Sequence, residues 1–186
     1  MIRSQDRSGW IGASDTHYVM GNWQTRSFDS WWLEKLGLRK NDFSNIYTRT
    51  GTEYEHKILD ALGFPLRKDY QIKIPRLRLR VNLDGDTPET IYEVKTHRAD
   101  RPFKVSRQYY GQVQVEMYAK RCAYCYIVSY GLMDDEYRNY FLSVDTARIR
   151  LHYIAYDEAY IAAYLPRLKY LAQCLKEKRW PDGAEI

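Results

Sequence analysis

Three ionisable residues in the middle of the chain have a type and spacing that suit metal-dependent chemistry. Glu93 follows Asp84 by nine residues, and Lys95 lies two residues after Glu93. The segment 90–96, TIYEVKT, is typical of a strand. Because side chains alternate between the faces of a strand, Glu93 and Lys95 should share one face with Ile91. A charged group buried alone is costly, so the pair needs a compensating partner.

The spacing of the two carboxylates fits a β-hairpin. Segment 77–84 alternates like a strand and 85–89, GDTPE, has the composition of a turn, so Asp84 and Glu93 should converge near one end of a sheet. Oxygen ligands of this kind suit Mg²⁺ or Mn²⁺. Such an ion can neutralise a phosphodiester and lower the pKa of a bound water. Lys95 would then stabilise the transition state and orient or help deprotonate the water.

The same residues also have a purely structural interpretation. An Asp, a Glu and a Lys at this spacing arise often by chance where 28% of residues are charged. They would then form a cross-strand salt bridge on an exposed hairpin, and such a salt bridge contributes little to the stability of the fold. Asp86 is a further acid in the turn and competes with Asp84 for the role of ligand. The pattern therefore gains weight only from the motifs around it.

The elements that would position these residues alternate along the chain. Helices are expected at 14–20, 27–37, 51–63, 108–119 and 157–180. Strands are expected at 70–74, 77–84, 90–96, 123–130, 137–144 and 148–156. Ser14 should cap the first helix, Ser27 or Asp29 the second, and Pro166 should kink the last. This order predicts an α/β fold with a central mixed sheet flanked by helices, in a single domain over residues 1–186.

Charge and composition narrow the class of protein. Lys and Arg total 29 against 24 Asp and Glu, a net charge of +5 that is compatible with a polyanionic partner. The basic stretches 76–80 and 98–107 flank the central strand on both sides. No run of 18 apolar residues occurs and no apolar stretch follows a basic N-terminus, so neither a membrane span nor a signal peptide is expected.

The cysteines indicate a reducing compartment. Three cysteines are too few for a disulfide framework, which favours the cytoplasm. Cys122 and Cys125 form a C-x-x-C, but only the distant Cys174 could join them as a further thiolate ligand. We interpret them as packed thiols rather than as part of a metal cluster.

Four motifs surround the central residues. They are RSGWIGASD at 7–15, GTEYE at 51–55, LDGD with YEVK between 83 and 95, and YYGQVQVEMY at 109–118. In this order they resemble the PD-(D/E)XK nucleases, and within them the phage lambda exonuclease or YqaJ-like viral recombinases. The resemblance extends from Arg7 to the final helix and implies a restriction-endonuclease-like core. Leu83 departs from the pattern, because the family often has proline there, but that proline is not a ligand.

The resemblance implies a metal site built from carboxylates. Asp84 and Glu93 match the metal-binding acids, Glu55 matches the helical glutamate that completes the cluster, and the carbonyl of Val94 is a further ligand. Glu55 also has a structural interpretation, because Thr52 three residues earlier gives the spacing of a helix capping box.

The remaining assignments concern the phosphate groups of a substrate. Lys95 matches the catalytic lysine, and Gln112 matches a residue near the scissile or terminal phosphate. Arg7 and Ser14 match the pair that binds a 5′-terminal phosphate. A helix N-terminus at Ser14 with Arg7 nearby would suit an anion, although Ser14 can equally be a plain helix cap.

The resemblance therefore implies a Mg²⁺-dependent exodeoxyribonuclease, with Mn²⁺ able to substitute. It would degrade one strand of linear duplex DNA 5′→3′ from 5′-phosphorylated ends, beside a single-strand annealing protein in phage-type recombination. A ring-shaped homo-oligomer acting in the host cytoplasm is also implied. The alternatives are a structure-specific or restriction-type endonuclease on the same core and a catalytically decayed DNA-binding protein. All core residues are present, which argues against decay.

Overall fold

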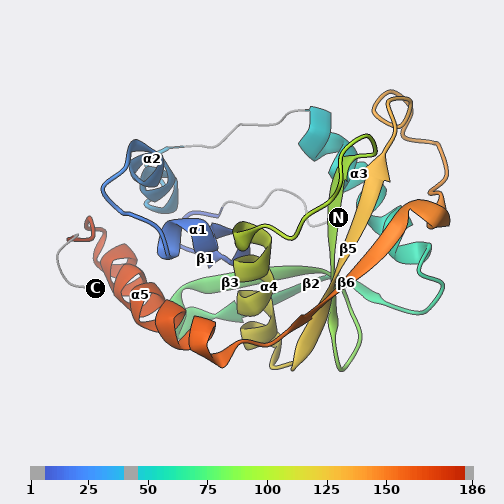
Figure 1. Cartoon of the computed structure of the whole chain (residues 1–186). Coiled ribbons are helices and arrows are strands. Elements are labelled where there is room, and N and C mark those ends of the chain that lie inside the picture. Colours follow the sequence, from blue (N-terminus) through green and yellow to red (C-terminus); the bar gives the residue numbers. More distant parts are fainter. Residues whose placement is uncertain (1–6, 40–45, 183–186) are drawn as a thin grey trace.

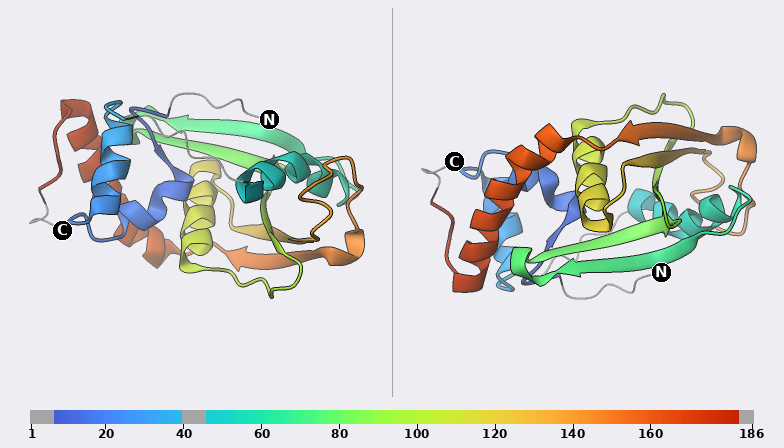
Figure 2. Two further views of the ribbon diagram at one scale, coloured as in Figure 1. Left: turned by 90° about the horizontal axis from the view of Figure 1, so that it is seen from above. Right: turned by 90° about the horizontal axis from the view of Figure 1, so that it is seen from below.

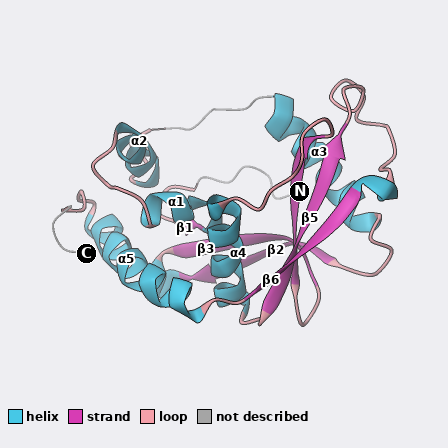
Figure 3. Cartoon of the chain, viewed as in Figure 1, coloured by secondary structure: helices cyan, strands magenta, loops and turns pink. Residues whose placement is uncertain are grey.

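A curled mixed β-sheet forms the centre of the molecule, and helices flank it (Figures 1 and 3). The structure is a computed structural model that describes residues 7–39 and 46–182. Its strands are β1 (Ile11–Gly12), β2 (Arg67–Ile74), β3 (Leu79–Asp86), β4 (Ile91–Arg98), β5 (Tyr124–Leu132) and β6 (Ile149–Ala155). Its helices are α1 (Thr16–Val19), α2 (Arg26–Lys35), α3 (Ile46–Asp60), α4 (Arg107–Lys120) and α5 (Glu158–Glu177). Short 3-10 turns are η1 (Ala13–Asp15), η2 (Pro75–Leu77) and η3 (Thr146–Arg148).

These elements confirm the predicted α/β fold with a central mixed sheet and flanking helices. Figure 2 shows α2 and α5 at one end of the molecule and α3 at the other, with α4 between them. Within the part of the chain that the structure describes, no helix has both the length and the apolar character that crossing a membrane requires.

The sheet opens at the predicted hairpin. The strands follow the order β1-β3-β4-β5-β6, and β2 pairs with β3. Strands β3 and β4 form the antiparallel hairpin, but the ladder pairs only Gly85 with Tyr92 and Asp86 with Ile91. At Asp84 the side chain, rather than the backbone, bonds to β4. Farther from the turn, the start of β3 pairs with β1 instead. The hairpin therefore opens on the side that carries Asp84.

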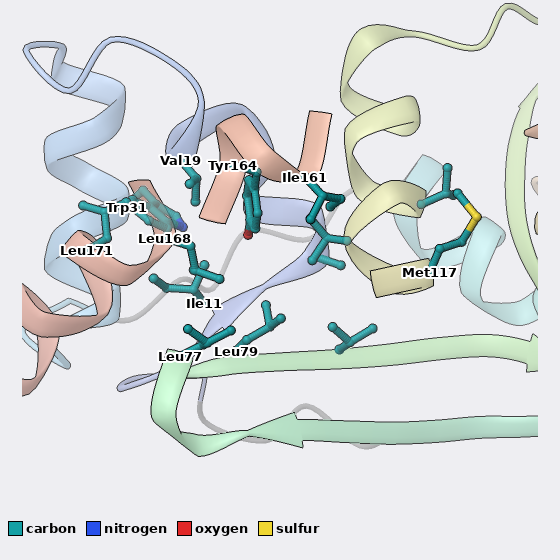
Figure 4. Close-up of a cluster of buried hydrophobic side chains, with 14 of the residues drawn as sticks. Ile11, Val19, Trp31, Leu77, Leu79, Met117, Ile161, Tyr164, Leu168 and Leu171 are labelled. Atoms are coloured by element: carbon teal, nitrogen blue, oxygen red, sulfur yellow. The ribbon is translucent and has the colours of Figure 1, made fainter. Parts of the chain in front are cut away.

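The two faces of β4 pack in different apolar clusters, as the alternation predicted. Ile91 packs in a cluster with residues of α2, α4 and α5, part of which Figure 4 shows. Tyr92 and Val94 pack instead with Tyr54 and Ile58 of α3. The polar residues Glu93 and Lys95 therefore lie on the Ile91 face, beneath α4.

The caps predicted for the first two helices are wrong. Ser14 does not cap a helix over 14–20: it lies within η1, and α1 begins after Asp15. Helix α2 is capped by Thr25, whose hydroxyl accepts a hydrogen bond from the Phe28 N–H at 3.2 Å, and not by Ser27 or Asp29. In both places the sequence offers several adjacent hydroxyl and carboxyl groups, and only the backbone conformation decides which one caps.

The start of α3 removes the capping-box interpretation of Glu55. The helix begins at Ile46 rather than at Gly51, so Thr52 lies inside it. There the Thr52 hydroxyl donates to the Thr48 carbonyl at 3.0 Å. Gly51 suggested a boundary, but it lies inside the helix, where a Cβ added to it would meet the Thr96 hydroxyl oxygen at 2.9 Å. Close packing against β4 therefore explains this glycine.

The strand predicted at 137–144 is also wrong, because these residues form turns. Tyr137, Tyr140 and Val144 are partly buried against the cluster around Tyr54. Glu136 holds the segment in place: its carboxylate accepts from Tyr130 Oη at 2.7 Å and from Arg148 Nη1 at 2.6 Å. The alternation of apolar residues was real, but it reflects side chains that anchor a loop.

A buried ion pair holds the turn that carries Ser14. Lys35 Nζ of α2 lies 2.6 Å from Asp15 Oδ2, and the same oxygen accepts from the Gly12 N–H at 2.7 Å. Both charged residues are buried. Helix α2 therefore fixes η1 through one carboxylate.

Replacing Lys35 with Met should lower the free energy of unfolding by about 3 kcal/mol, because it leaves Asp15 buried and unpaired. Urea denaturation measures the change. Lys169→Met, at an exposed position of α5, is the control and should stay within about 0.5 kcal/mol of the parent. Equal stability of the two variants would contradict the role given to the pair.

Candidate active site

A cavity of about 240 Å³ lies beside the open part of the hairpin. Its lining includes Arg7, Ser14, Arg80, Asn82, Asp84, Glu93, Lys95, Gln112 and Glu116. The structure thus brings together six of the eight predicted site residues, from the N-terminal segment, two strands and α4. Glu55 and Val94 are not among the lining residues.

A hydrogen-bond network centred on Glu93 forms the floor of this cavity. Lys95 Nζ donates to Glu93 Oε1 at 2.8 Å and to Gln112 Oε1 at 3.0 Å. The Gln112 amide Nε2 donates to Glu93 Oε1 at 2.5 Å and to Glu116 Oε1 at 2.8 Å. The ammonium group of Lys95 is therefore held between the Glu93 carboxylate and the Gln112 amide. Helix α4 carries Gln112, which also fixes Glu93.

The charges in the cavity shift one another's protonation. Burial raises the pKa of Asp84 well above its usual range, and the nearby charges of Glu93 and Glu55 add to this. Burial alone would lower the pKa of Lys95, but the charges of Glu93 and Asp84 outweigh it and raise the pKa. Lys95 is therefore an ammonium group at neutral pH, while Asp84 lacks a sufficient positive partner.

The residues present fit a divalent cation. Glu93 Oε2 is buried and has no hydrogen-bond partner within the described chain. Among residues 7–39 and 46–182, the Val94 N–H is the one hydrogen-bond donor to Asp84 Oδ2, at 2.8 Å. Carboxylate oxygens that lack partners, together with a raised carboxyl pKa, are what a site for a hard cation shows without its ion. The Val94 carbonyl stays a predicted ligand.

Glu55 interacts with the charge of Glu93 and also belongs to a second group of potential ligands. Burial raises its pKa to about 7, and the charge of Glu93 is the next largest cause. Its carboxylate also belongs to a group with His56 and Asp69 whose ligand atoms lie within 4.8 Å of one another. Glu55 is therefore close enough to Glu93 to feel its charge, and its role as a ligand of the acidic cluster stays a prediction.

Sequence reasoning missed Glu116. This glutamate is fully buried one helical turn after Gln112, and its Oε2 has no hydrogen-bond partner among the described residues. Burial raises its pKa well above the usual range, and the charge of Glu93 adds to this. The i, i+4 spacing from Gln112 was a usable signal, because it places both side chains on one face of a helix.

Arg80 and Asn82 were missed for a similar reason. They precede Asp84 at intervals of two in β3, so strand alternation places all three on one face. Arg80 is buried and lies opposite Gly12 in the pairing of β3 with β1. Together with Arg7, it gives the part of the cavity next to β1, four residues before Asp84 along β3, two cationic groups, and we call this part the cationic end.

Asp86, the competing acid, is structural. Arg67 binds it through Nε at 2.9 Å and Nη2 at 2.6 Å, and Lys120 also donates to it. Although burial raises the pKa of Asp86, these hydrogen bonds outweigh it and lower the pKa. Asp86 thus already has its cationic partners, and Asp84 is the carboxylate that remains for a ligand.

Comparison with known proteins places the fold among nucleases. The crystal structure of LHK-Exo in complex with dAMP superposes with a TM-score of 0.70 at 21% identity, covering 92% of this chain and 90% of that one. LHK-Exo is an alkaline exonuclease from Laribacter hongkongensis. A phage-related exonuclease from Haemophilus somnus gives a TM-score of 0.66 at 18% identity, covering 91% of this chain and 96% of that one. The sequence matches no protein-family model and no curated protein. The structural likeness shows that the chain has the fold of these exonucleases.

The raised carboxyl pKa values predict an unusual pH dependence in EDTA. The unfolded chain ionises Glu55 near pH 4.5, whereas the folded chain holds its proton until about pH 7. The folded state therefore binds more protons in this window, and its free energy of unfolding should fall as the pH rises from 5 to 8, by about 1 kcal/mol or more.

Urea denaturation at pH 5 and pH 8 measures this change. Glu55→Gln should show a smaller fall, and Glu53→Gln, which alters an exposed acid of the same helix, should match the parent. Asp86 and Glu136 have lowered pKa values and lose their contributions at lower pH, outside this window. A free energy of unfolding that rises between pH 5 and pH 8 would contradict the account.

Proposed function

We propose that this chain is a metal-dependent exodeoxyribonuclease that hydrolyses one strand of linear duplex DNA 5′→3′ from 5′-phosphorylated ends. The observation that supports it most is the meeting of Asp84, Glu93 and Lys95 in one cavity. The fold agrees with it, because both exonucleases above share that fold, and one of them was crystallised with a mononucleotide.

Asp84 and Glu93 would hold Mg²⁺, or Mn²⁺ in its place, with Glu55 and the Val94 carbonyl completing the set. When bound, the cation would neutralise the phosphate and lower the pKa of a bound water. The donors of the cavity are hard oxygen atoms, which fits these ions better than softer metals.

Lys95 and Gln112 would act on the scissile phosphate. The Lys95 ammonium is held 2.8 Å from Glu93, and it can stabilise negative charge that develops on the phosphate oxygens. Because its pKa is raised, Lys95 keeps its proton and is better suited to this role than to that of a base. The Gln112 amide fixes the Lys95 and Glu93 side chains and so limits their movement during the reaction.

The cationic end of the cavity would select the DNA end. Arg7 and Ser14, with Arg80 beside them, line the cavity that also contains the carboxylates. A terminal 5′-phosphate bound there would place the first phosphodiester near Glu93. Backbone contacts of this kind carry no base information, in keeping with sequence-independent digestion. The annealing-protein partner, the ring-shaped homo-oligomer and the cytoplasmic location stay predictions of the resemblance.

Digestion of matched DNA substrates tests the proposal. With Mg²⁺ the protein should degrade linear duplex with 5′-phosphate faster than linear duplex with 5′-hydroxyl, and EDTA should abolish both reactions. Lys95→Ala should still bind DNA but lose about 100-fold or more in rate, because it removes a charge that stabilises the transition state. Lys169→Ala is the control for loss of an exposed lysine.

Arg7→Gln separates end selection from hydrolysis. It should slow digestion of the phosphorylated duplex and leave the 5′-hydroxyl duplex unaffected. Cleavage of covalently closed circular duplex would favour an endonuclease instead. Binding without hydrolysis under all conditions would favour a catalytically decayed protein.

A further inference from the structure

Aromatic rings extend from Lys95 into the loop between β4 and α4. The Tyr109 ring centre lies 5.0 Å from Lys95 Nζ, and the Phe103 ring stacks on Tyr109 at 6.0 Å with 7° between their planes. Phe103 in turn lies 4.9 Å from the His152 ring and 5.4 Å from the His97 ring. A continuous row of rings thus begins at the proposed catalytic lysine, and none of these rings takes part in the proposed hydrolysis.

The order of the strands places this row on the far side of the cavity from the phosphate-binding end. Ser14 follows β1, Asp84 lies on β3 and Lys95 on β4, while His152 lies on β6 at the other edge. A DNA strand with its end at Ser14 and its scissile bond near Lys95 would therefore reach the rings with its next nucleotides. Phe103 and Tyr109 are only partly buried, so part of each ring is open to a ligand.

The same loop is strongly cationic. Arg101, Lys104 and Arg107 are exposed, and within residues 7–39 and 46–182 none of the three has an ion-pair partner closer than 4.0 Å. Arg98 differs, because it binds Asp100 at 3.0 Å. Exposed cations interleaved with rings are the combination that single-stranded nucleic acid requires, since the cations bind phosphates and the rings stack on bases.

We propose that residues 98–109 form a track for single-stranded DNA. Phe103 and Tyr109 stack on the bases immediately 3′ of the bond being hydrolysed, and Arg101, Lys104 and Arg107 contact the phosphates of those nucleotides. The position relative to the scissile bond rests on the proposed function. Binding of single-stranded DNA to this loop does not, and it can be measured without hydrolysis.

The test uses a 5′-phosphorylated 12-nucleotide oligothymidylate that carries 2-aminopurine at its third position, in EDTA. Stacking on the rings should quench the 2-aminopurine fluorescence. Phe103→Leu keeps an apolar side chain at the loop but removes one of the two rings, so the quenching should weaken and the affinity should fall about tenfold.

A triple variant tests the cations independently and remains informative if Phe103→Leu does not fold. Arg101→Gln, Lys104→Gln and Arg107→Gln together should make the slope of log affinity against log salt shallower by about 2, because each phosphate contact on a single strand contributes about 0.7. The matched control changes Arg26, Lys169 and Lys176 to Gln, which removes the same charge at the α2–α5 end of the molecule (Figure 2). Its slope should equal that of the parent.

The outcomes separate this proposal from the proposed function. Equal slopes for the two triple variants, or unchanged quenching in a folded Phe103→Leu variant, would overturn the track even if the parent digests linear duplex. Loss of binding in the loop variants of a protein without nuclease activity would support the track and remove the exonuclease.

Discussion

Mutual repulsion among buried and half-buried carboxylates is the constraint on which the proposed site depends. Asp84, Glu55 and Glu116 all have raised pKa values, and in each case the charge of Glu93 is the largest cause after burial. One ammonium group, that of Lys95, offsets only part of this charge. A folded protein keeps such an arrangement at a cost in stability, which a divalent cation would relieve when it binds.

The contrast between Asp84 and Asp86 shows how the sheet creates this state. The two acids lie two residues apart on β3, where Asp86 is buried and Asp84 is half-buried. Asp86 lies where β3 and β4 still pair, and Arg67 and Lys120 neutralise it. Asp84 lies where the ladder has ended, and its side chain bonds to the Val94 N–H of β4 instead. Opening of the hairpin thus gives one acid a structural role and leaves the other for a ligand.

Much of the site could be predicted because it depends on local periodicity. Alternation along β4 placed Glu93 and Lys95 on one face, and the hairpin spacing brought Asp84 to them. Glu116 and Arg80 obey the same periodicities, but nothing in the sequence alone distinguishes a buried acid or arginine from one on a solvated face. For Glu116 the tertiary contact of α4 with β4 decides this, through residues 19 positions apart, and for Arg80 the pairing of β3 with β1 does.

The errors in the fold arose where local signals compete with tertiary packing. Gly51 suggested a helix boundary, yet α3 continues through it, and the missing side chain leaves room for Thr96 of β4. The segment 137–144 alternates like a strand, yet its apolar side chains anchor a loop held by Glu136 and Arg148. In both cases the residue types were informative about burial but not about the backbone conformation that burial would take.

Anomalous diffraction from a crystal soaked in Mn²⁺ tests the central claim most directly. We expect a manganese ion that contacts carboxylate oxygens of both Asp84 and Glu93, within coordination distance of the Val94 carbonyl. Manganese bound only at the Glu55, His56 and Asp69 group, or absent from the cavity at saturating concentration, would contradict it.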